Sequence, residues 1–199
     1  MVAKTLSSIN KIILSLYNDG NINKSALANL RASNSINSKH MTEVWPIFFK
    51  YIAKEDLSQN YKPSYTEIAV FTAVKCFAIY QQGSTECTYG KSYGDNAKGL
   101  TFFNALANLR KDAEEKEALD RRVQALLATS NVESVINGII HTLQILKSHN
   151  KHLVIDFAKL GQDLYHFQFD SYSARETCLK WGEEYFGNCQ IFCVNRFFS

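Results

Sequence analysis

The stretch that most constrains the fold lies in the middle of the chain, from Gly99 to Ala128. Apolar residues recur there at helical spacing in two blocks, and the charged run Lys111 to Glu117 separates the blocks. This pattern predicts a helical hairpin. In its second helix, Arg121 falls nearly opposite the apolar stripe and Arg122 falls at the edge of the stripe, so we expect both guanidinium groups to reach outward.

Helical spacing also dominates the rest of the chain, and strand-like alternation is absent before the last dozen residues. The sequence therefore predicts an all-α fold, made of two small helical bundles joined by a long loop that contains glycine and lysine. The expected organisation is an N-terminal bundle over residues 1–82, a flexible loop over 83–98, a C-terminal bundle over 99–187, and an apolar tail over 188–199 for which strand, packed arm and sticky end stay open. Helices are expected at residues 9–17, 25–33, 44–52, 65–82, 102–110, 119–127, 132–147, 153–167 and 171–186.

The loop between the two bundles is rich in glycine and carries Lys91 and Lys98. Because it has little apolar surface to bury, we expect it to be mobile in the free protein, with both lysines suited to contact phosphate. Its Gly90-Lys91-Ser92 run resembles the end of a nucleotide-binding P-loop. Six residues instead of four separate Gly83 from Gly90, however, and a helix precedes them, so the pattern does not indicate a nucleotide hydrolase.

Composition narrows the classes of protein that remain. The chain has 199 residues, 46% of them hydrophobic, which is enough for a core. It contains no apolar run of about 18 residues, and we expect neither a membrane span nor a secretory leader. Five cysteines, an odd number in a chain that needs no disulfides, suit a reducing compartment, so a cytoplasmic protein without a membrane contact is predicted. Residues 1–112 hold 13 basic against 8 acidic side chains, which concentrates positive charge in the first half.

One constellation could bind a metal ion. His149 and His152 could ligate a metal with Cys178, or with Cys189 and Cys193, but the sequence lacks a second close pair of ligands. A polar surface turn is the favoured interpretation of the two histidines, and we expect no metal and no cofactor.

The order of the helical segments resembles the small subunit of Cascade, the type I-E CRISPR surveillance complex. That family is all-helical, and two copies of it take part in an RNA-guided DNA-binding assembly. The resemblance implies that the partners are other Cascade subunits, a second copy of this chain, the guide RNA with its target DNA, and the displaced DNA strand. The matching segments are ALANLR (26–31), TEIAVFTAVKCFAIYQQ (66–82), FFNALANLR (102–110), RRVQALL (121–127), IDFAKLGQDL (155–164) and LKWGEEYF (179–186).

The resemblance also implies a role for basic patches, which in this family hold the nucleic-acid backbone while base pairing reads the sequence. Two features depart from the family pattern. After Trp181 the chain reads Gly-Glu-Glu where some members carry basic residues, and the tail rich in cysteine and phenylalanine has no counterpart. On this chain the family's nucleic-acid-binding positions fall on Arg31, Lys91, Lys98, Arg110, Arg121, Arg122, Lys147 and Lys151.

We therefore predict a non-catalytic subunit that binds nucleic-acid backbone and stabilises the R-loop in antiviral defence. One alternative is a helical scaffold that binds only proteins. A second is a helical ribonuclease, which the spacing disfavours: such enzymes place four to six residues between a catalytic arginine and histidine, and eight residues separate Arg31 from His40.

Overall fold

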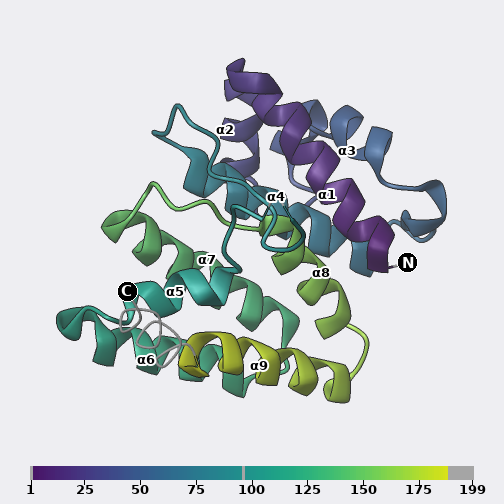
Figure 1. Cartoon of the computed structure of the whole chain (residues 1–199). Coiled ribbons are helices and arrows are strands. Elements are labelled where there is room, and N and C mark those ends of the chain that lie inside the picture. Colours follow the sequence, from purple (N-terminus) through teal and green to yellow (C-terminus); the bar gives the residue numbers. More distant parts are fainter. Residues whose placement is uncertain (1, 96, 188–199) are drawn as a thin grey trace.

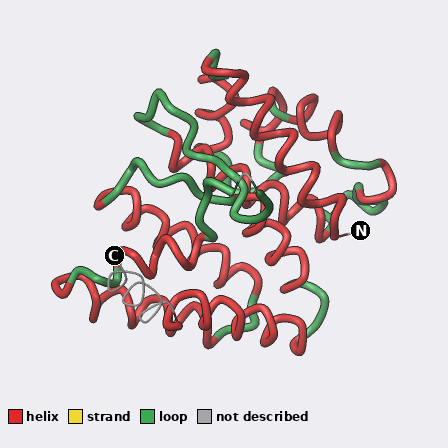
Figure 2. The backbone as a smooth tube through the Cα atoms, in the orientation of Figure 1, coloured by secondary structure: helices red, strands yellow, loops and turns green. Residues whose placement is uncertain are grey.

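The structure is a computed structural model that describes residues 2–95 and 97–187. Throughout this part of the chain the regular elements are helices, joined by short 3₁₀ turns, and the predicted all-α fold is confirmed (Figures 1 and 2). The described residues form no strand and only two isolated parallel bridges. The helices are α1 (Val2–Tyr17), α2 (Lys24–Ala32), α3 (Trp45–Tyr51), α4 (Tyr65–Gln81), α5 (Phe102–Leu109), α6 (Ala113–Ala128), α7 (Val132–His149), α8 (Phe157–Phe167) and α9 (Ser171–Phe186).

Polar side chains fix where the helices begin. At the start of α4, Ser64 and Glu67 form a capping box: the Ser64 hydroxyl accepts from the Glu67 amide at 3.1 Å, and the Glu67 carboxylate accepts from the Ser64 amide at 2.7 Å. A single Asn, Thr or Asp side chain caps six other helices in the same way and satisfies an amide that the first turn leaves unpaired. These caps are Asn23, Thr101, Asp112, Asn131, Asp156 and Asp170.

Helix α4 is the centre of the molecule, because nearly all of its residues are buried on every side. Helices α1 and α8 pack against α4 and against each other. Gly161 of α8 lies at the tightest point of this crossing, where a Cβ atom would overlap Ile9 of α1 and come within 2.8 Å of the Ala73 Cβ atom of α4. The absence of a side chain at Gly161 is what lets the three helices approach so closely.

The helices gather into two groups that do not follow the order of the chain. Helix α8 packs against α1 and α4, while α5 and α6 pack against both α7 and α9 (Figure 1). The first group therefore includes a helix from the segment 99–187, and the contacts α8 to α9 and α4 to α7 join the groups. Two independent bundles, one over residues 1–82 and one over 99–187, stay a prediction. The packing of α8 against α1 and α4 does not favour it. No helix within the described residues is long and apolar enough to cross a membrane.

Both ends of the loop that follows α4 are tied to the segment before α8. The Ile155 amide donates to the Thr88 carbonyl at 2.9 Å, and the Asp156 amide donates to the Leu100 carbonyl at 2.8 Å. This pairing holds residues 153–155 extended, so α8 begins at Phe157 and the predicted start at residue 153 is wrong. The loop's own composition gave no sign of these contacts, because the partner segment lies more than fifty residues away.

Mobility of the loop stays a prediction that amide exchange can test residue by residue. The amides of Gly90 and Leu100 donate to carbonyls of the segment 153–155, so we expect slow exchange at both. Residues 93–95 at the exposed tip should exchange fast. Fast exchange at Gly90 and Leu100 as well would show that the loop is mobile along its whole length in solution.

Candidate nucleic-acid interface

Arg31 reaches from the last turn of α2 onto the C-terminal half of α4. Its Nη1 atom donates to the Ala78 carbonyl oxygen at 3.2 Å. The side chain is half-buried, and burial lowers the pKa of its guanidinium group from the ordinary value. Arg31 is thus held against the protein by a neutral carbonyl and keeps its full positive charge, with further donors of the guanidinium available to a ligand.

Lys75 comes from the buried helix α4 and is only 7% exposed. Its Nζ atom donates to the Ser33 carbonyl just beyond α2 and lies 5.9 Å from the centroid of the Phe71 ring. Burial lowers the pKa of this ammonium group. The sequence placed Lys75 in the most apolar segment of the chain, and it was not among the predicted nucleic-acid-binding residues.

Lys147 approaches the same place from α7. Its Nζ atom donates to the Ile79 carbonyl at 2.6 Å and to the Gln82 amide oxygen at 3.4 Å. Burial, together with the nearby positive charge of Arg31, lowers the pKa of Lys147. The structure therefore brings Arg31 and Lys147, which are predicted residues from opposite halves of the chain, close enough to repel each other.

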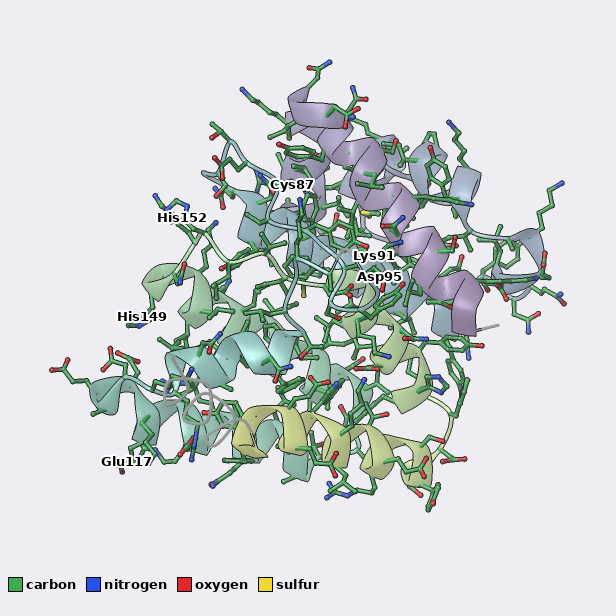
Figure 3. All side chains as sticks on the ribbon, viewed as in Figure 1. Cys87, Lys91, Asp95, Glu117, His149 and His152 are labelled. Atoms are coloured by element: carbon green, nitrogen blue, oxygen red, sulfur yellow. The ribbon has the colours of Figure 1, made fainter. Side chains whose placement is uncertain are left out.

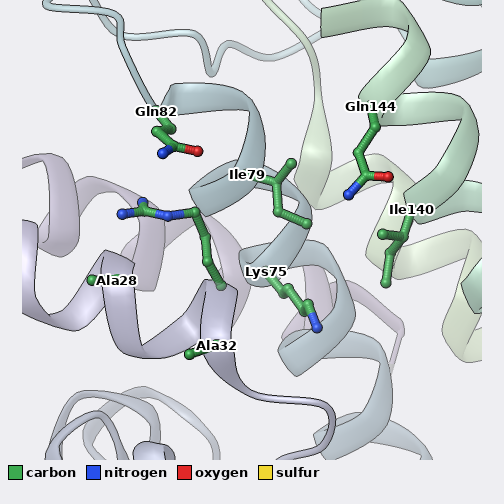
Figure 4. A pocket seen from close by; sticks show the side chains of 8 residues that line it. Ala28, Ala32, Lys75, Ile79, Gln82, Ile140 and Gln144 are labelled. Atoms are coloured by element: carbon green, nitrogen blue, oxygen red, sulfur yellow. The ribbon is translucent and has the colours of Figure 1, made fainter.

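Arg31 and Lys75 line one cavity of about 490 Å³, which we call the basic groove. Lys147 lies at its edge, because its Nζ atom donates to Ile79 and Gln82, which also line the cavity. Figure 4 shows its labelled side chains arriving from α2 and α7 on opposite sides of α4. None of the residues that line it is acidic, and within residues 2–95 and 97–187 no carboxylate pairs with Arg31, Lys75 or Lys147. Besides the cations, the lining consists of Ala28, Ala32, Ile79, Gln82, Ile140 and Gln144.

Arg121 and Arg122 lie on α6, which packs beside α7. Both side chains are exposed, as the sequence predicted. The Arg122 side chain donates to the Ala118 carbonyl at 2.9 Å and to His141 Nε2 of α7 at 3.3 Å. The Arg121 side chain makes no hydrogen bond or ion pair with the described part of the chain. Helix α7 thus carries Lys147 at the edge of the basic groove and also contacts Arg122 of α6 through His141.

Arg110 lies in a different environment. Its Nε and Nη2 atoms donate to the two carboxylate oxygens of Asp120, at 2.7 and 3.2 Å, and its guanidinium carbon lies 5.5 Å from the centroid of the Tyr185 ring. Although burial acts to raise the pKa of Asp120, hydrogen bonds from Arg110 and Tyr185 hold it below the usual value. Arg110 therefore joins α5, α6 and α9, and its Nε and Nη2 donors are held in a two-point pairing with the Asp120 carboxylate.

The remaining predicted lysines are exposed. Lys91 and Lys98 lie at the neck of the loop, where the Lys98 amide donates to the Lys91 carbonyl at 3.1 Å, and Figure 3 labels Lys91 in this loop. Lys151 follows α7, and its carbonyl accepts from the Ser84 hydroxyl at 3.3 Å. Lys151 is therefore near the end of α4 that carries Gln82, so it extends the positive charge beyond the basic groove.

The possible metal site is not assembled among the described residues, which contain no group of three or more His, Cys, Asp or Glu side chains able to hold an ion. His149 instead lies 3.4 Å from a carboxylate oxygen of Glu115, and His149 and His152 project near the edge of the molecule in Figure 3. Cys189 and Cys193, together with the whole predicted tail 188–199, lie outside the described residues.

The protein is thus an all-α protein with an electropositive groove between its two groups of helices. The family model for the CRISPR-associated protein Cse2 matches residues 26–186, and the chain belongs to this family. The family, also called CasB, supplies a subunit of the CRISPR Cascade complex. The predicted resemblance is confirmed.

A solved structure agrees with this assignment. The crystal structure of CasB from Thermobifida fusca superposes with a TM-score of 0.64 and covers 92% of this chain and 96% of its own. At 17% sequence identity, this likeness shows a shared fold. A comparison with curated protein sequences gives no significant match.

Proposed function

We propose that this protein is a non-catalytic Cascade subunit whose basic groove holds the sugar-phosphate backbone and thereby stabilises the R-loop. The observation that carries the proposal is the convergence of Arg31, Lys75 and Lys147 on one groove without a carboxylate partner among the described residues. Bringing like charges together in a partly desolvated place is unfavourable. A bound phosphate would offset that cost.

The mechanism is electrostatic. Each neutralised phosphate releases condensed counterions, so binding is tolerant of sequence and falls steeply with salt. Exchanging a DNA duplex for an RNA–DNA heteroduplex is nearly balanced in free energy, so a few backbone contacts are enough to favour the open state. Base pairing with the guide RNA reads the target sequence, while this subunit lowers the free energy of the opened strands.

The other exposed cations extend this surface. We assign Arg121 and Arg122 of α6, together with Lys151, to outer phosphate contacts, and Lys91 and Lys98 to contacts made by the loop. Arg110 has a structural role in this proposal because Asp120 accepts its hydrogen bonds. The partners are the other Cascade subunits, a second copy of this chain, the guide RNA with its target, and the displaced DNA strand.

Neutralising the basic groove tests this function. In a complex reconstituted with partner subunits and a guide RNA, Arg31→Gln combined with Lys147→Gln should weaken DNA binding equally for every matched target. The slope of log affinity against log salt should fall by roughly 0.7 to 0.9 for each lost phosphate contact. Affinity measured at several salt concentrations gives both quantities.

Lys62→Gln is the matched control, because Lys62 is an exposed cation before α4, at the end of this helix opposite Gln82. Thermal unfolding of each free variant separates lost binding from lost stability. A double variant that assembles normally and binds DNA with unchanged affinity and salt slope would favour the scaffold that binds only proteins.

A further inference from the structure

A second cavity of about 450 Å³ lies between the same two helices, next to the basic groove. On α4, Lys75 lines the basic groove, and Phe71 and Ile68, in the preceding turns, line the second cavity. On α7, Ile140 lines the basic groove, and Ile136 and Val132, in the preceding turns, line the second cavity. We call this second cavity the apolar chamber. Because both helices contribute successive turns to both cavities, the two cavities lie one after the other along α4 and α7, and we call the pair the channel.

The two cavities differ in chemistry. The chamber walls are Ile36, Ile68, Phe71, Val132 and Ile136, and no Lys or Arg lines it. Lys75 marks the border, since its Nζ atom lies 5.9 Å from the Phe71 ring centroid while its side chain lines the basic groove. A phosphate is therefore favoured on one side of Lys75, and an uncharged, largely apolar group is favoured on the other.

A nucleotide has both parts, a phosphate and a largely apolar base. We propose that the apolar chamber binds unpaired nucleobases of a single-stranded nucleic acid whose phosphates contact Arg31, Lys75 and Lys147. This inference rests on the proposed function and assigns the channel to the displaced strand. Bases within a duplex are stacked and paired and cannot enter such a chamber, whereas a single strand can turn its bases out.

Polar groups in the chamber suit this ligand. The side-chain amides of Asn34 and Asn137 and the carboxylate of Glu133 line the cavity, and they can exchange hydrogen bonds with base edges without attracting phosphate. The volume is also within the range of about 300 to 1,000 Å³ typical of small-ligand sites. A peptide would fill the apolar walls equally well, but it would leave the adjoining cluster of cations without a counter-charge.

Abasic DNA separates the contribution of the bases from that of the backbone. The reconstituted complex is given a target whose displaced strand cannot pair with the target strand, so removing its bases leaves duplex opening unchanged. The displaced strand carries either normal bases or abasic sites along its length. We expect the abasic strand to lower the affinity of the complex by about tenfold, the order of magnitude for bases packed against a protein.

Ile136→Asn should reduce that difference to about threefold or less, because it makes the chamber wall polar without changing its charge. Leu14→Asn is the matched control, since Leu14 is an apolar residue of α1 that is 50% exposed. Arg31→Gln combined with Lys147→Gln should weaken binding of both strands by the same factor.

The outcomes distinguish the two proposals. Equal affinity for normal and abasic strands, with a loss of binding in the Arg31→Gln, Lys147→Gln variant, would overturn the chamber and leave the proposed function intact. No loss in that variant would overturn both. Failure of a folded Ile136→Asn chain to join the complex would show that the chamber binds protein instead, which also overturns the inference.

Discussion

Gly161→Ala is expected to lower the free energy of unfolding by roughly 3 kcal/mol, the upper part of the range for overpacked cores. The added methyl group would overlap Ile9 of α1, come within 2.8 Å of the Ala73 Cβ atom and lie 3.3 Å from the Ala69 carbonyl oxygen. The Ile9 side chain could turn away, but α4 cannot retreat because it is buried on all sides. Chemical denaturation of the free chain measures the change.

Gly182→Ala provides the matched control for this prediction. Gly182 lies inside α9, where a Cβ atom would meet only Leu127 at an ordinary 3.6 Å, so alanine should stabilise the helix by about 0.5 to 1 kcal/mol. Shortening Ile9 to valine should restore part of the stability lost in Gly161→Ala. An unchanged unfolding free energy in Gly161→Ala would mean that α1, α4 and α8 do not cross this closely.

Asp156→Ala is expected to lower the free energy of unfolding by about 3 kcal/mol, and also to release the loop. The Asp156 carboxylate is fully buried, and one oxygen accepts from the amide and hydroxyl of Ser92 at 2.7 and 2.8 Å. The other oxygen caps α8 by accepting from the Lys159 amide at 2.9 Å. Removing the carboxylate leaves buried donors unpaired, each at a cost of about 1 to 3 kcal/mol.

Asp170→Ala isolates the contribution of the cap. Asp170 caps α9 from an exposed position, accepting from the Ser173 amide at 2.7 Å, so its loss should cost only about 1 kcal/mol. Amide exchange at Gly90 and Leu100 should accelerate in Asp156→Ala and stay unchanged in Asp170→Ala. Equal costs for the two variants would indicate that Asp156 acts only as a helix cap and does not hold the loop.

Much of the fold could be predicted because helical periodicity is a local property. The spacing of apolar residues located the helices, including the hairpin of α5 and α6, and placed Arg121 and Arg122 on the exposed surface. The start of α8 was missed because residues 153–155 pair with a distant loop, and no pattern within fifteen residues records that pairing.

The candidate site was less predictable, because its geometry depends on contacts between segments far apart in the chain. Lys75 lies in a segment whose sequence is that of a buried core helix. Its place in the basic groove follows from α2 ending where the Ser33 carbonyl can accept a hydrogen bond from its ammonium group. Arg110 looked equivalent to Arg31 in the sequence, yet Asp120 and Tyr185 enclose its guanidinium group. The sequence offered one hint about the site, which is Lys75 itself, because a buried helix rarely carries a lysine without a partner for its charge.

The amino-acid sequence alone therefore predicts the all-α class, the family and the set of cations from which an interface could be built. Which of these cations meet depends on how the helices pack: Arg31, Lys75 and Lys147 converge although they come from α2, α4 and α7. The physical reason is one of range. A helix forms from side chains three and four residues apart, whereas a groove forms where helices distant in sequence pack, and that packing depends on close approaches such as the one at Gly161.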